Sequence, residues 1–290
     1  MKEIEKSELI INPDGSIFHL HLKPEQIADD IILVGDPGRV ALVSEHFDKI
    51  EYIVKNREFI THTGYYKGKR ISVIATGIGT DNIDIVINEL DALVNIDLKS
   101  RTIKDEHKSL NFVRIGTSGG LQEDLEVDSF LLSEMAIGFD GLLNFYKQRD
   151  EVCNLDMEEK FIKHMNWNPR IASPYFVNSS EILNKRLGDA FNKGITISSP
   201  GFYGPQGREL RLKIQDSEIN NKIRTFRYDN MRITNYEMES SAIFGLSGLL
   251  GHNASTVCVI IANRYNKQYS KDYKIAVKKL IKIVLDKLIE

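Results

Sequence analysis

Short apolar runs alternate with helix-like patterns along nearly the whole chain, and this alternation constrains the fold more than any other feature. The runs that predict strands are residues 31–34, 52–54, 59–66, 71–75, 112–115, 130–137, 195–198 and 256–262. Apolar residues at helical spacing predict a short helix from residue 40 and longer helices over 82–95, 182–191, 237–250 and 272–289. Such alternation is typical of an α/β fold, here with a central mixed, mainly parallel β-sheet flanked by helices.

Composition narrows the class of protein. The 290 residues carry a formal net charge of −3, so no broad basic field indicates nucleic-acid binding, and local arginines must hold any bound anion. Cys153 and Cys258 lie far apart and predict neither a disulfide framework nor a cysteine zinc site. No apolar run approaches the roughly 18 residues of a membrane span. The first six residues lack the apolar core of a signal peptide, so we expect a cytoplasmic protein.

We expect a single domain over residues 1–290, because no linker, repeat or shift of composition divides the chain. Residues 97–111 are highly charged and interrupt the pattern between a predicted helix and the next strand. We interpret this segment as a solvated surface insertion without a chemical role.

The turn from Phe202 to Arg208 combines an aromatic ring, an amide and a guanidinium in a Gly/Pro-rich sequence. Gln206 offers both a donor and an acceptor, and Arg208 offers a rigid fork of donors. This set matches the edge of a small planar amide such as a pyrimidine base, with Phe202 against a flat ring or sugar. The same residues are also compatible with an ordinary surface loop.

Two loops that follow predicted strands have the composition of anion sites. In the Gly35-Asp-Pro-Gly-Arg39 turn, backbone amides can cup an anion under Arg39, or the turn simply connects a strand to a helix. Arg114 stands among apolar residues, where a guanidinium is costly unless it is paired. Either an acidic partner or a bound anion, helped by Thr117 and the neighbouring glycines, would satisfy it.

Two polar segments lie near the end of the chain. Glu239 falls in the first turn of the predicted helix 237–250, where a carboxylate can bind the hydroxyls of a vicinal diol or simply favour the helix dipole. Arg264 follows the last predicted strand. Because ligands of open α/β sheets lie beyond the carboxyl ends of strands, we expect the loops at residues 35, 117 and 264 to share one crevice.

Other motifs match known patterns only in part. Gly77-Ile-Gly79-Thr-Asp-Asn82 begins like a dinucleotide fingerprint, but an asparagine replaces the last glycine. Gly116-Thr-Ser118-Gly-Gly120 matches the nucleophile elbow of serine hydrolases, although no long elbow helix is evident after it. No histidine pair has zinc-protease spacing, so no catalytic metal is predicted.

Together and in this order, the motifs resemble the nucleoside phosphorylase superfamily, and its uridine phosphorylase branch in particular. The match runs from Phe18-His19-Leu20 to Asn263-Arg264. Its landmarks are Gly-Asp-Pro-Gly-Arg, Asn-Arg57-Glu-Phe, Thr-Gly-Ile-Gly, Arg-Ile-Gly-Thr-Ser-Gly-Gly, Phe-Tyr-Gly-Pro-Gln-Gly-Arg and Asn-Tyr-Glu-Met-Glu-Ser. The resemblance implies a pentosyltransferase of pyrimidine salvage that converts uridine and inorganic phosphate to uracil and ribose 1-phosphate without an organic cofactor. Deoxyuridine and thymidine stay open as further substrates.

The resemblance also implies roles for single residues. Phosphate would be bound by Gly35, Arg39, Arg57, Arg114 and Thr117. Ribose would be bound by His19, Met238 and Glu239, and the base by Phe202, Gln206, Arg208 and Arg264. The catalytic groups would be Arg114, Gln206 and Arg208. Since Arg57 and His19 would come from a neighbouring subunit, a homodimer or a hexamer built from dimers is implied.

Four questions stay open at this point. The purine branch places an aspartate near the last strand, and Ala262-Asn263-Arg264 stands there instead, which favours a pyrimidine base. A nucleosidase of the same superfamily would need no phosphate arginines. A catalytically silent nucleoside-binding protein on the same fold would use the same residues. Some family members bind a potassium ion through a glutamate equivalent to Glu58, so the resemblance implies a potassium site there.

Overall fold

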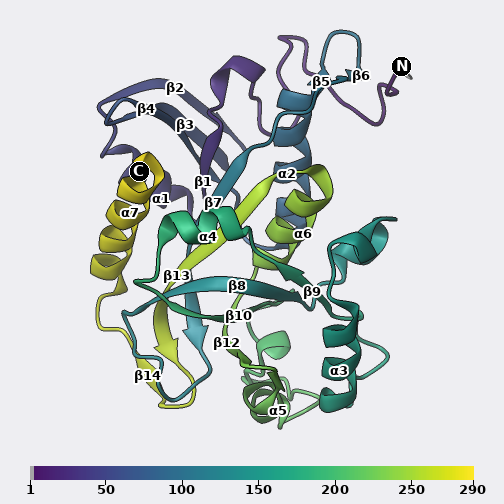
Figure 1. The fold of residues 1–290 in the computed structure, drawn as a ribbon, viewed down its shortest axis with the longest axis vertical. Coiled ribbons are helices and arrows are strands. Elements are labelled where there is room, and N and C mark those ends of the chain that lie inside the picture. The colour runs from purple at the N-terminus through teal and green to yellow at the C-terminus, as the bar shows by residue number, and fades with distance from the viewer. Residues whose placement is uncertain (1–2) are drawn as a thin grey trace.

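The computed structural model describes residues 3–290 and consists of one large mixed sheet with helices on both of its faces (Figure 1). The strands of this sheet are β1 (Asp30–Val34), β2 (Lys49–Asn56), β3 (Phe59–Tyr66), β4 (Lys69–Ala75), β7 (Asn111–Gly120), β8 (Phe130–Gly138), β9 (Tyr175–Asn178), β10 (Asn192–Ser198), β11 (Arg227–Tyr228), β12 (Met231–Glu237), β13 (Asn253–Asn263) and β14 (Gln268–Tyr269). The helices are α1 (Pro37–Ser44), α2 (Thr80–Asn95), α3 (Leu155–Met165), α4 (Glu181–Leu187), α5 (Ile219–Thr225), α6 (Ser240–Leu250) and α7 (Tyr273–Ile289).

The strand order places the ends of distant strands next to one another. It is β11-β12-β10-β8-β13-β7-β1-β4-β3-β2, with β9 beside β8 and β14 beside β13. β7 runs parallel to both β1 and β13, whereas β2, β3 and β4 form an antiparallel meander. β12 also pairs with the end of β7, where Tyr236 faces Gly119, so β7, β13, β8, β10 and β12 close into a ring. This closure brings the end of β12 alongside the end of β7.

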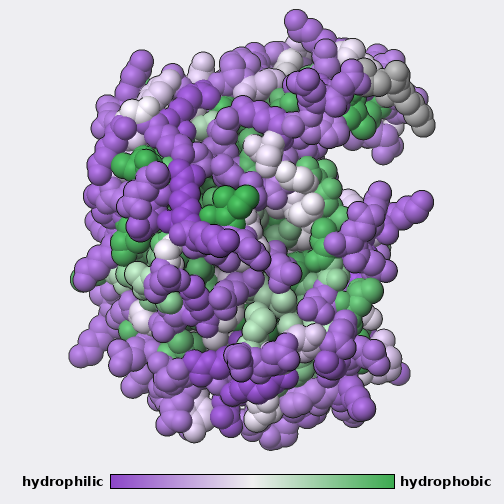
Figure 2. Space-filling model, in the orientation of Figure 1, coloured by the Kyte–Doolittle hydropathy of each residue, from purple (hydrophilic) through white to green (hydrophobic). Residues whose placement is uncertain are grey.

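Apolar residues of the helices cover the sheet. α2 and α6 pack on each other, and Ile83 and Ile243 are buried there with Phe112 of β7. A second cluster forms under α1, α4 and α7, where Leu280 is buried, and a third forms between α3, α5 and the strands β9, β10 and β12, around Phe161. The outer face seen in Figure 2 is mainly hydrophilic, with hydrophobic residues in smaller groups. The helices thus bury the apolar stripes that the sequence predicts.

The predicted fold class is confirmed, since the chain forms a single-domain α/β structure with a mixed sheet. Residues 97–111 are mostly exposed and begin with a small hairpin of β5 (Ile96–Asp97) and β6 (Thr102–Ile103). The backbone amide of Ile4 donates to the carbonyl of Arg101 at 2.8 Å, so this hairpin contacts the N-terminal segment. Among residues 3–290, none of the helices combines the length and the apolarity that a bilayer crossing requires.

Several predicted boundaries are wrong, and three of them have a clear physical reason. The helix predicted over 237–250 begins only at Ser240, because β12 continues to Glu237 in parallel pairing with β10. The strand predicted over 112–115 extends to Gly120, because β13 pairs with it along its whole length. The helix predicted over 182–191 ends at Leu187, because Gly188 adopts a left-handed φ of 85° and stops it.

Candidate active site

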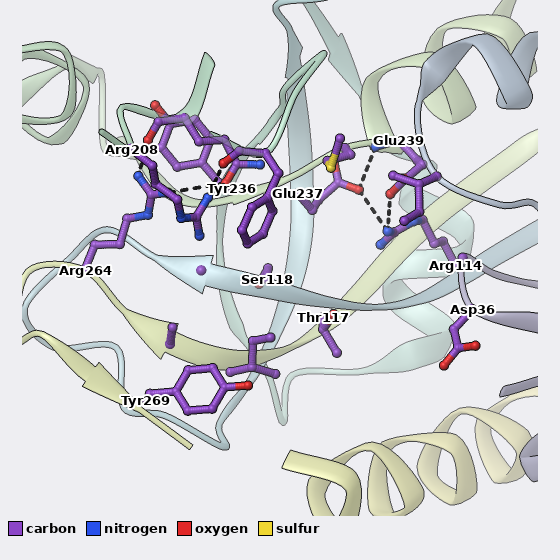
Figure 3. A pocket seen from close by; sticks show the side chains of 18 of the residues that line it. Asp36, Arg114, Thr117, Ser118, Arg208, Tyr236, Glu237, Glu239, Arg264 and Tyr269 are labelled. Atoms are coloured by element: carbon purple, nitrogen blue, oxygen red, sulfur yellow. Dashed lines mark hydrogen bonds and ion pairs between the residues drawn. The ribbon is translucent and has the colours of Figure 1, made fainter. Parts of the chain in front are cut away.

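A cavity of about 1150 Å³ lies where the ends of β1, β7, β12 and β13 meet the turn that follows β10. Ten of the twelve predicted site residues line it: Gly35, Arg39, Arg114, Thr117, Phe202, Gln206, Arg208, Met238, Glu239 and Arg264. Figure 3 shows Arg208, Arg264 and Tyr236 at one end, and Arg114 and Glu239 with Asp36 at the other. Ser118 and Thr117 of β7 lie between the two ends.

One end of the cavity is built around a buried guanidinium. Arg114 Nη2 donates to the Glu239 carboxylate and lies 3.3 Å from Glu237 Oε2. Burial alone would lower the pKa of Arg114, but Glu239 and Glu237 outweigh burial and raise the pKa above its ordinary value. The structure therefore provides the acidic partners that the sequence left open. Arg114 Nε is buried and has no hydrogen-bond partner among residues 3–290.

Arg39 is the second guanidinium at this end. It comes from α1, whose first turn is capped by Asp36, since that carboxylate accepts from the Gly38 amide at 2.8 Å. Arg39 Nη1 donates to the carbonyl of Ile115 in β7 at 3.1 Å. Burial, followed by the neighbouring charge of Arg114, lowers the pKa of Arg39. Two arginines from different elements thus converge on one buried spot, where an anion would relieve their mutual repulsion.

Glu239 connects this end to the middle of the cavity. Its Oε1 accepts from the backbone amide of Gly79 at 2.8 Å. Gly79 has a φ of 101°, which favours glycine, so the partial dinucleotide motif serves here to present an amide to Glu239. Burial raises the pKa of Glu239 and Glu237 adds to the effect, while Arg114 opposes it. Glu239 immediately precedes α6, and Met238 beside it also lines the cavity.

The other end consists of stacked side chains on an irregular turn. The guanidinium carbon of Arg208 lies 3.8 Å from the centroid of the Phe202 ring, and its Nη1 donates to the Phe202 carbonyl at 2.6 Å. Arg208 Nη1 also donates to Gln206 Oε1. Burial lowers the pKa of Arg208. The aromatic ring and the amide therefore hold the guanidinium in one orientation.

Arg264 approaches the same glutamine from the end of β13. Its Nη1 donates to the Gln206 carbonyl, and its Nη2 lies 3.4 Å from Gln206 Oε1. Its guanidinium lies 5.0 Å from the centroid of the Tyr236 ring. Burial, followed by the charge of Arg208, lowers the pKa of Arg264 to about 10. Two arginines hold the side-chain oxygen of Gln206. Its amide nitrogen has no hydrogen-bond partner among residues 3–290 and can donate to a ligand.

His19 and Arg57 do not line the cavity. His19 Nδ1 lies 2.6 Å from Glu89 Oε1, and the Arg57 guanidinium lies 5.6 Å from the ring centroid of Phe18. Arg57 has a φ of 53°, an unusual conformation for an arginine. The two residues thus lie near each other, around Phe18. Within this chain they are not part of the cavity that the ten residues above line.

The nucleophile-elbow interpretation of Ser118 is wrong. Ser118 lies within β7, paired with Ile260 of β13, and the strand continues to Gly120 without a turn into a helix. Its Oγ is buried and has no hydrogen-bond partner among the described residues, so no histidine activates it. A serine hydrolase requires both features.

The acids that line the cavity come from outside the turn Phe202 to Arg208. Asn263, in the Ala262-Asn263-Arg264 segment at the end of β13, donates its amide to the carbonyls of Gln122 and Leu125 at 2.8 and 2.6 Å. Its role is therefore structural. Glu58 lines the cavity near Gly77 and Asn82, but residues 3–290 hold no cluster of three or more His, Cys, Asp or Glu side chains that could bind a metal. The potassium site stays a prediction.

Among the lining residues that were not predicted individually, two are especially well buried. Glu237 and Tyr236 line the cavity and are almost completely buried, and the Tyr236 hydroxyl has no partner among the described residues. Burial raises the pKa of that hydroxyl, which therefore stays protonated. Both residues belong to the Asn-Tyr-Glu-Met-Glu-Ser landmark, and recognising it as the end of a strand would have indicated them.

The geometry and the sequence agree with a family assignment. Residues 29–290 match the model of the phosphorylase superfamily, and the chain belongs to this superfamily. The chain is 30% identical over 258 residues to a uridine phosphorylase from Thermococcus kodakarensis, covering 89% of this chain and 81% of that protein. It is 26% identical over 251 residues to a purine nucleoside phosphorylase from Streptococcus suis, covering 86% and 88%.

Solved structures are also similar over nearly the full length, and one of them carries a functional description. It is a nucleoside phosphorylase from Trypanosoma brucei, described as showing uridine phosphorylase activity. The two structures superpose with a TM-score of 0.87 at 30% sequence identity, covering 97% of this chain and 99% of that one.

Proposed function

We propose that this protein is a pentosyltransferase that cleaves uridine with inorganic phosphate to give uracil and ribose 1-phosphate. The observation that carries the proposal is a single cavity with two kinds of cationic site, one at each end. Arg39 and Arg114 are suited to a small oxyanion, and Gln206, Arg208 and Arg264 are suited to the edge of a planar base. Relatives of this chain include uridine phosphorylases, and this supports uridine and phosphate as the substrates.

The geometry supports a mechanism without a covalent intermediate. Phosphate bound by Arg39, Arg114, Thr117 and the Gly35 amide would face the anomeric carbon of a ribose held by Glu239 and Met238. As the glycosidic bond breaks, the sugar becomes oxocarbenium-like and the phosphate stabilises its positive charge. Arg208 and the free amide nitrogen of Gln206 would stabilise the negative charge on the departing uracil, with Arg264 in support. Donors that strengthen as charge develops lower the barrier.

The balance of charge at the phosphate end supports a shared site. The ionisable side chains that line this end are Asp36, Arg39, Glu58, Arg114, Glu237 and Glu239. Four carboxylates against two guanidiniums leave a formal balance of −2 when all are ionised, so the carboxylates offset much of the guanidinium charge available to a phosphate dianion. A third cation would favour phosphate binding, and we propose that Arg57 of a second subunit supplies it, with His19 of that subunit at the ribose. The active species would then be at least a homodimer.

The base end favours a pyrimidine over a purine. Within residues 3–290, the carboxylates that line the cavity are Asp36, Glu58, Glu237 and Glu239, and none of them belongs to the turn from Phe202 to Arg208. Asn263 is fixed to backbone carbonyls, so these residues supply no evident acid to protonate a departing purine. A nucleosidase is disfavoured because it uses water in place of phosphate, and water does not require the two arginines Arg39 and Arg114. A silent binding protein would use the same contacts, and only turnover separates it from an enzyme. Tolerance of deoxyuridine or thymidine and a cytoplasmic location stay predictions.

The test is to follow the ultraviolet absorbance of uridine with and without phosphate, with thymidine and inosine in parallel. We expect conversion of uridine that depends on phosphate, and little conversion of inosine. Hydrolysis of uridine at the same rate without phosphate would indicate a nucleosidase, and faster conversion of inosine would indicate the purine activity. Tight binding of uridine without any conversion would indicate a binding protein.

A further inference from the structure

Glu237 is a buried carboxylate at the last position of β12, with only 1% of its side chain exposed. Both of its oxygens accept hydrogen bonds from several elements. Oε1 accepts from the hydroxyl of Ser198 at 2.6 Å and from the amide of Ser240 at 3.0 Å. Oε2 accepts from the amide of Glu239 at 2.9 Å and lies 3.3 Å from Arg114 Nη2.

These contacts join two parts of the cavity. Arg114 belongs to β7 and to the phosphate end, whereas Glu239 immediately precedes α6 and belongs to the ribose subsite. The same oxygen of Glu237, Oε2, contacts the Arg114 guanidinium and accepts from the Glu239 backbone amide. It also anchors the first amide of α6, and Ser198 extends the network by accepting from the Ser241 amide at 2.9 Å. One side chain therefore sets the spacing between the two subsites.

The contacts already made leave Glu237 little capacity for a ligand. Four donors surround its two oxygens, and a carboxylate offers about four lone-pair sites in all. Glu239, by contrast, receives one amide and one guanidinium and has acceptor capacity left for hydroxyl groups. The two neighbouring acids thus have different roles, although both pair with Arg114.

We infer that Glu237 is a positioning residue that aligns Arg114 and Glu239, so that bound phosphate faces the anomeric carbon of the ribose. This inference deepens the proposed function and rests on it. It predicts that damage at Glu237 weakens both phosphate and nucleoside binding, because both subsites depend on the same carboxylate. A carboxylate that served only to cap α6 would affect stability and leave both substrates alone.

The test is Glu237→Gln, measured as KM for phosphate, KM for uridine and kcat. Glutamine has nearly the same shape as glutamate. Both oxygens of Glu237 face hydrogen-bond donors, so the NH₂ group of the glutamine must face donors in either orientation. We expect kcat/KM to fall about 10- to 100-fold for both substrates, the range that follows when buried donors lose their acceptor. Values for both substrates within twofold of wild type would overturn the inference.

Asp140→Asn is the matched control. Asp140 is a half-buried carboxylate that follows β8 and contacts the start of α6, since it accepts from the Ser241 hydroxyl at 3.1 Å and from Tyr175 at 2.9 Å, and it lies outside the cavity lining. We expect this variant to lower the melting temperature and to keep both KM values. If Asp140→Asn shifts the two KM values as strongly as Glu237→Gln does, Glu237 has no special role.

Ser198→Ala covers the case in which Glu237→Gln does not fold. It removes one donor to Glu237 and keeps the charge, so we expect a loss of a few-fold in kcat/KM for both substrates, and unchanged values would overturn the inference. Failure of the proposed function is recognised separately, because wild-type protein would then not convert uridine. In that case, calorimetry with inorganic phosphate on wild type and Glu237→Gln still tests the link to Arg114, and equal affinities would reject it.

Discussion

The two ends of the cavity hold their arginines in different ways. At the phosphate end, Arg114 is fixed by carboxylates within a ring of paired strands and is almost wholly buried. At the base end, Arg208 is stacked on Phe202 in a turn that has only one 3₁₀ segment, Gly204–Gln206. Charge pairing stabilises the first guanidinium, and stacking with an amide stabilises the second. A buried arginine with acidic partners is part of the fold, whereas a stacked arginine in a turn can be lost without unfolding the chain.

The strongest test of this contrast is Arg114→Ala. It leaves Glu237 and Glu239 buried without their guanidinium, so we expect a loss of about 3–5 kcal/mol in the free energy of unfolding. We also expect a loss of at least about 10³ in kcat/KM and a much higher requirement for phosphate. Urea denaturation and phosphate titration measure the two effects. An unchanged phosphate dependence in the folded variant would show that Arg114 is only structural.

Arg208→Ala should separate activity from stability. We expect kcat to fall by about 10² to 10³, because one charged donor to the departing base is lost. The free energy of unfolding should change by less than about 1 kcal/mol, since the side chain pairs with no buried acid. Steady-state kinetics and urea denaturation check both values. Near-normal turnover would count against the assignment of the base end.

Phe202→Leu probes the stacking itself. Leucine keeps an apolar contact but removes the aromatic face under Arg208, so we expect KM for uridine to rise about two- to fivefold. The phosphate KM should not change, because Phe202 belongs to the other end of the cavity. A larger effect on phosphate than on uridine would mean that the two ends are assigned the wrong way round.

The smallest effect is expected from thiol reagents. Burial raises the pKa of Cys258, which lies beside Arg114, to about 11, and burial raises the pKa of Cys153 to about 12. Since the thiolate is the reactive form, iodoacetamide at neutral pH should leave activity unchanged, and alkylation should increase only as the pH rises toward these values. Mass spectrometry with activity assays follows the reaction. Rapid, phosphate-protected alkylation of Cys258 at neutral pH would show that this end is open to solvent.

The sequence predicted the regular elements well where apolar periodicity was strong. Strand β3 has the predicted boundaries, and α2 differs by two residues. The helices α3 and α5 were not predicted. A further failure came where polar residues occupy buried strand positions. Asn235 and Glu237 are completely or almost completely buried, so the strand β12 carries no apolar alternation at its end and was interpreted as the start of a helix.

The site could be predicted as a set of residues, but its internal contacts could not. Motif order indicated the ten residues that line the cavity. The pairing of Arg114 with Glu237 depends on the ring closure between β7 and β12, which links positions more than a hundred residues apart and leaves no local signal. In the same way, the role of Gly79 as a donor to Glu239 follows only from the packing of α2 against α6.

The central claim is that one cavity binds phosphate at one end and the base at the other. A crystal structure of the protein with phosphate and uracil tests it most directly. The account predicts phosphate oxygens within hydrogen-bonding distance of Arg39 and Arg114, and the polar edge of uracil on Gln206 and Arg208. Phosphate bound at the base end, or uracil bound outside this cavity, would contradict it.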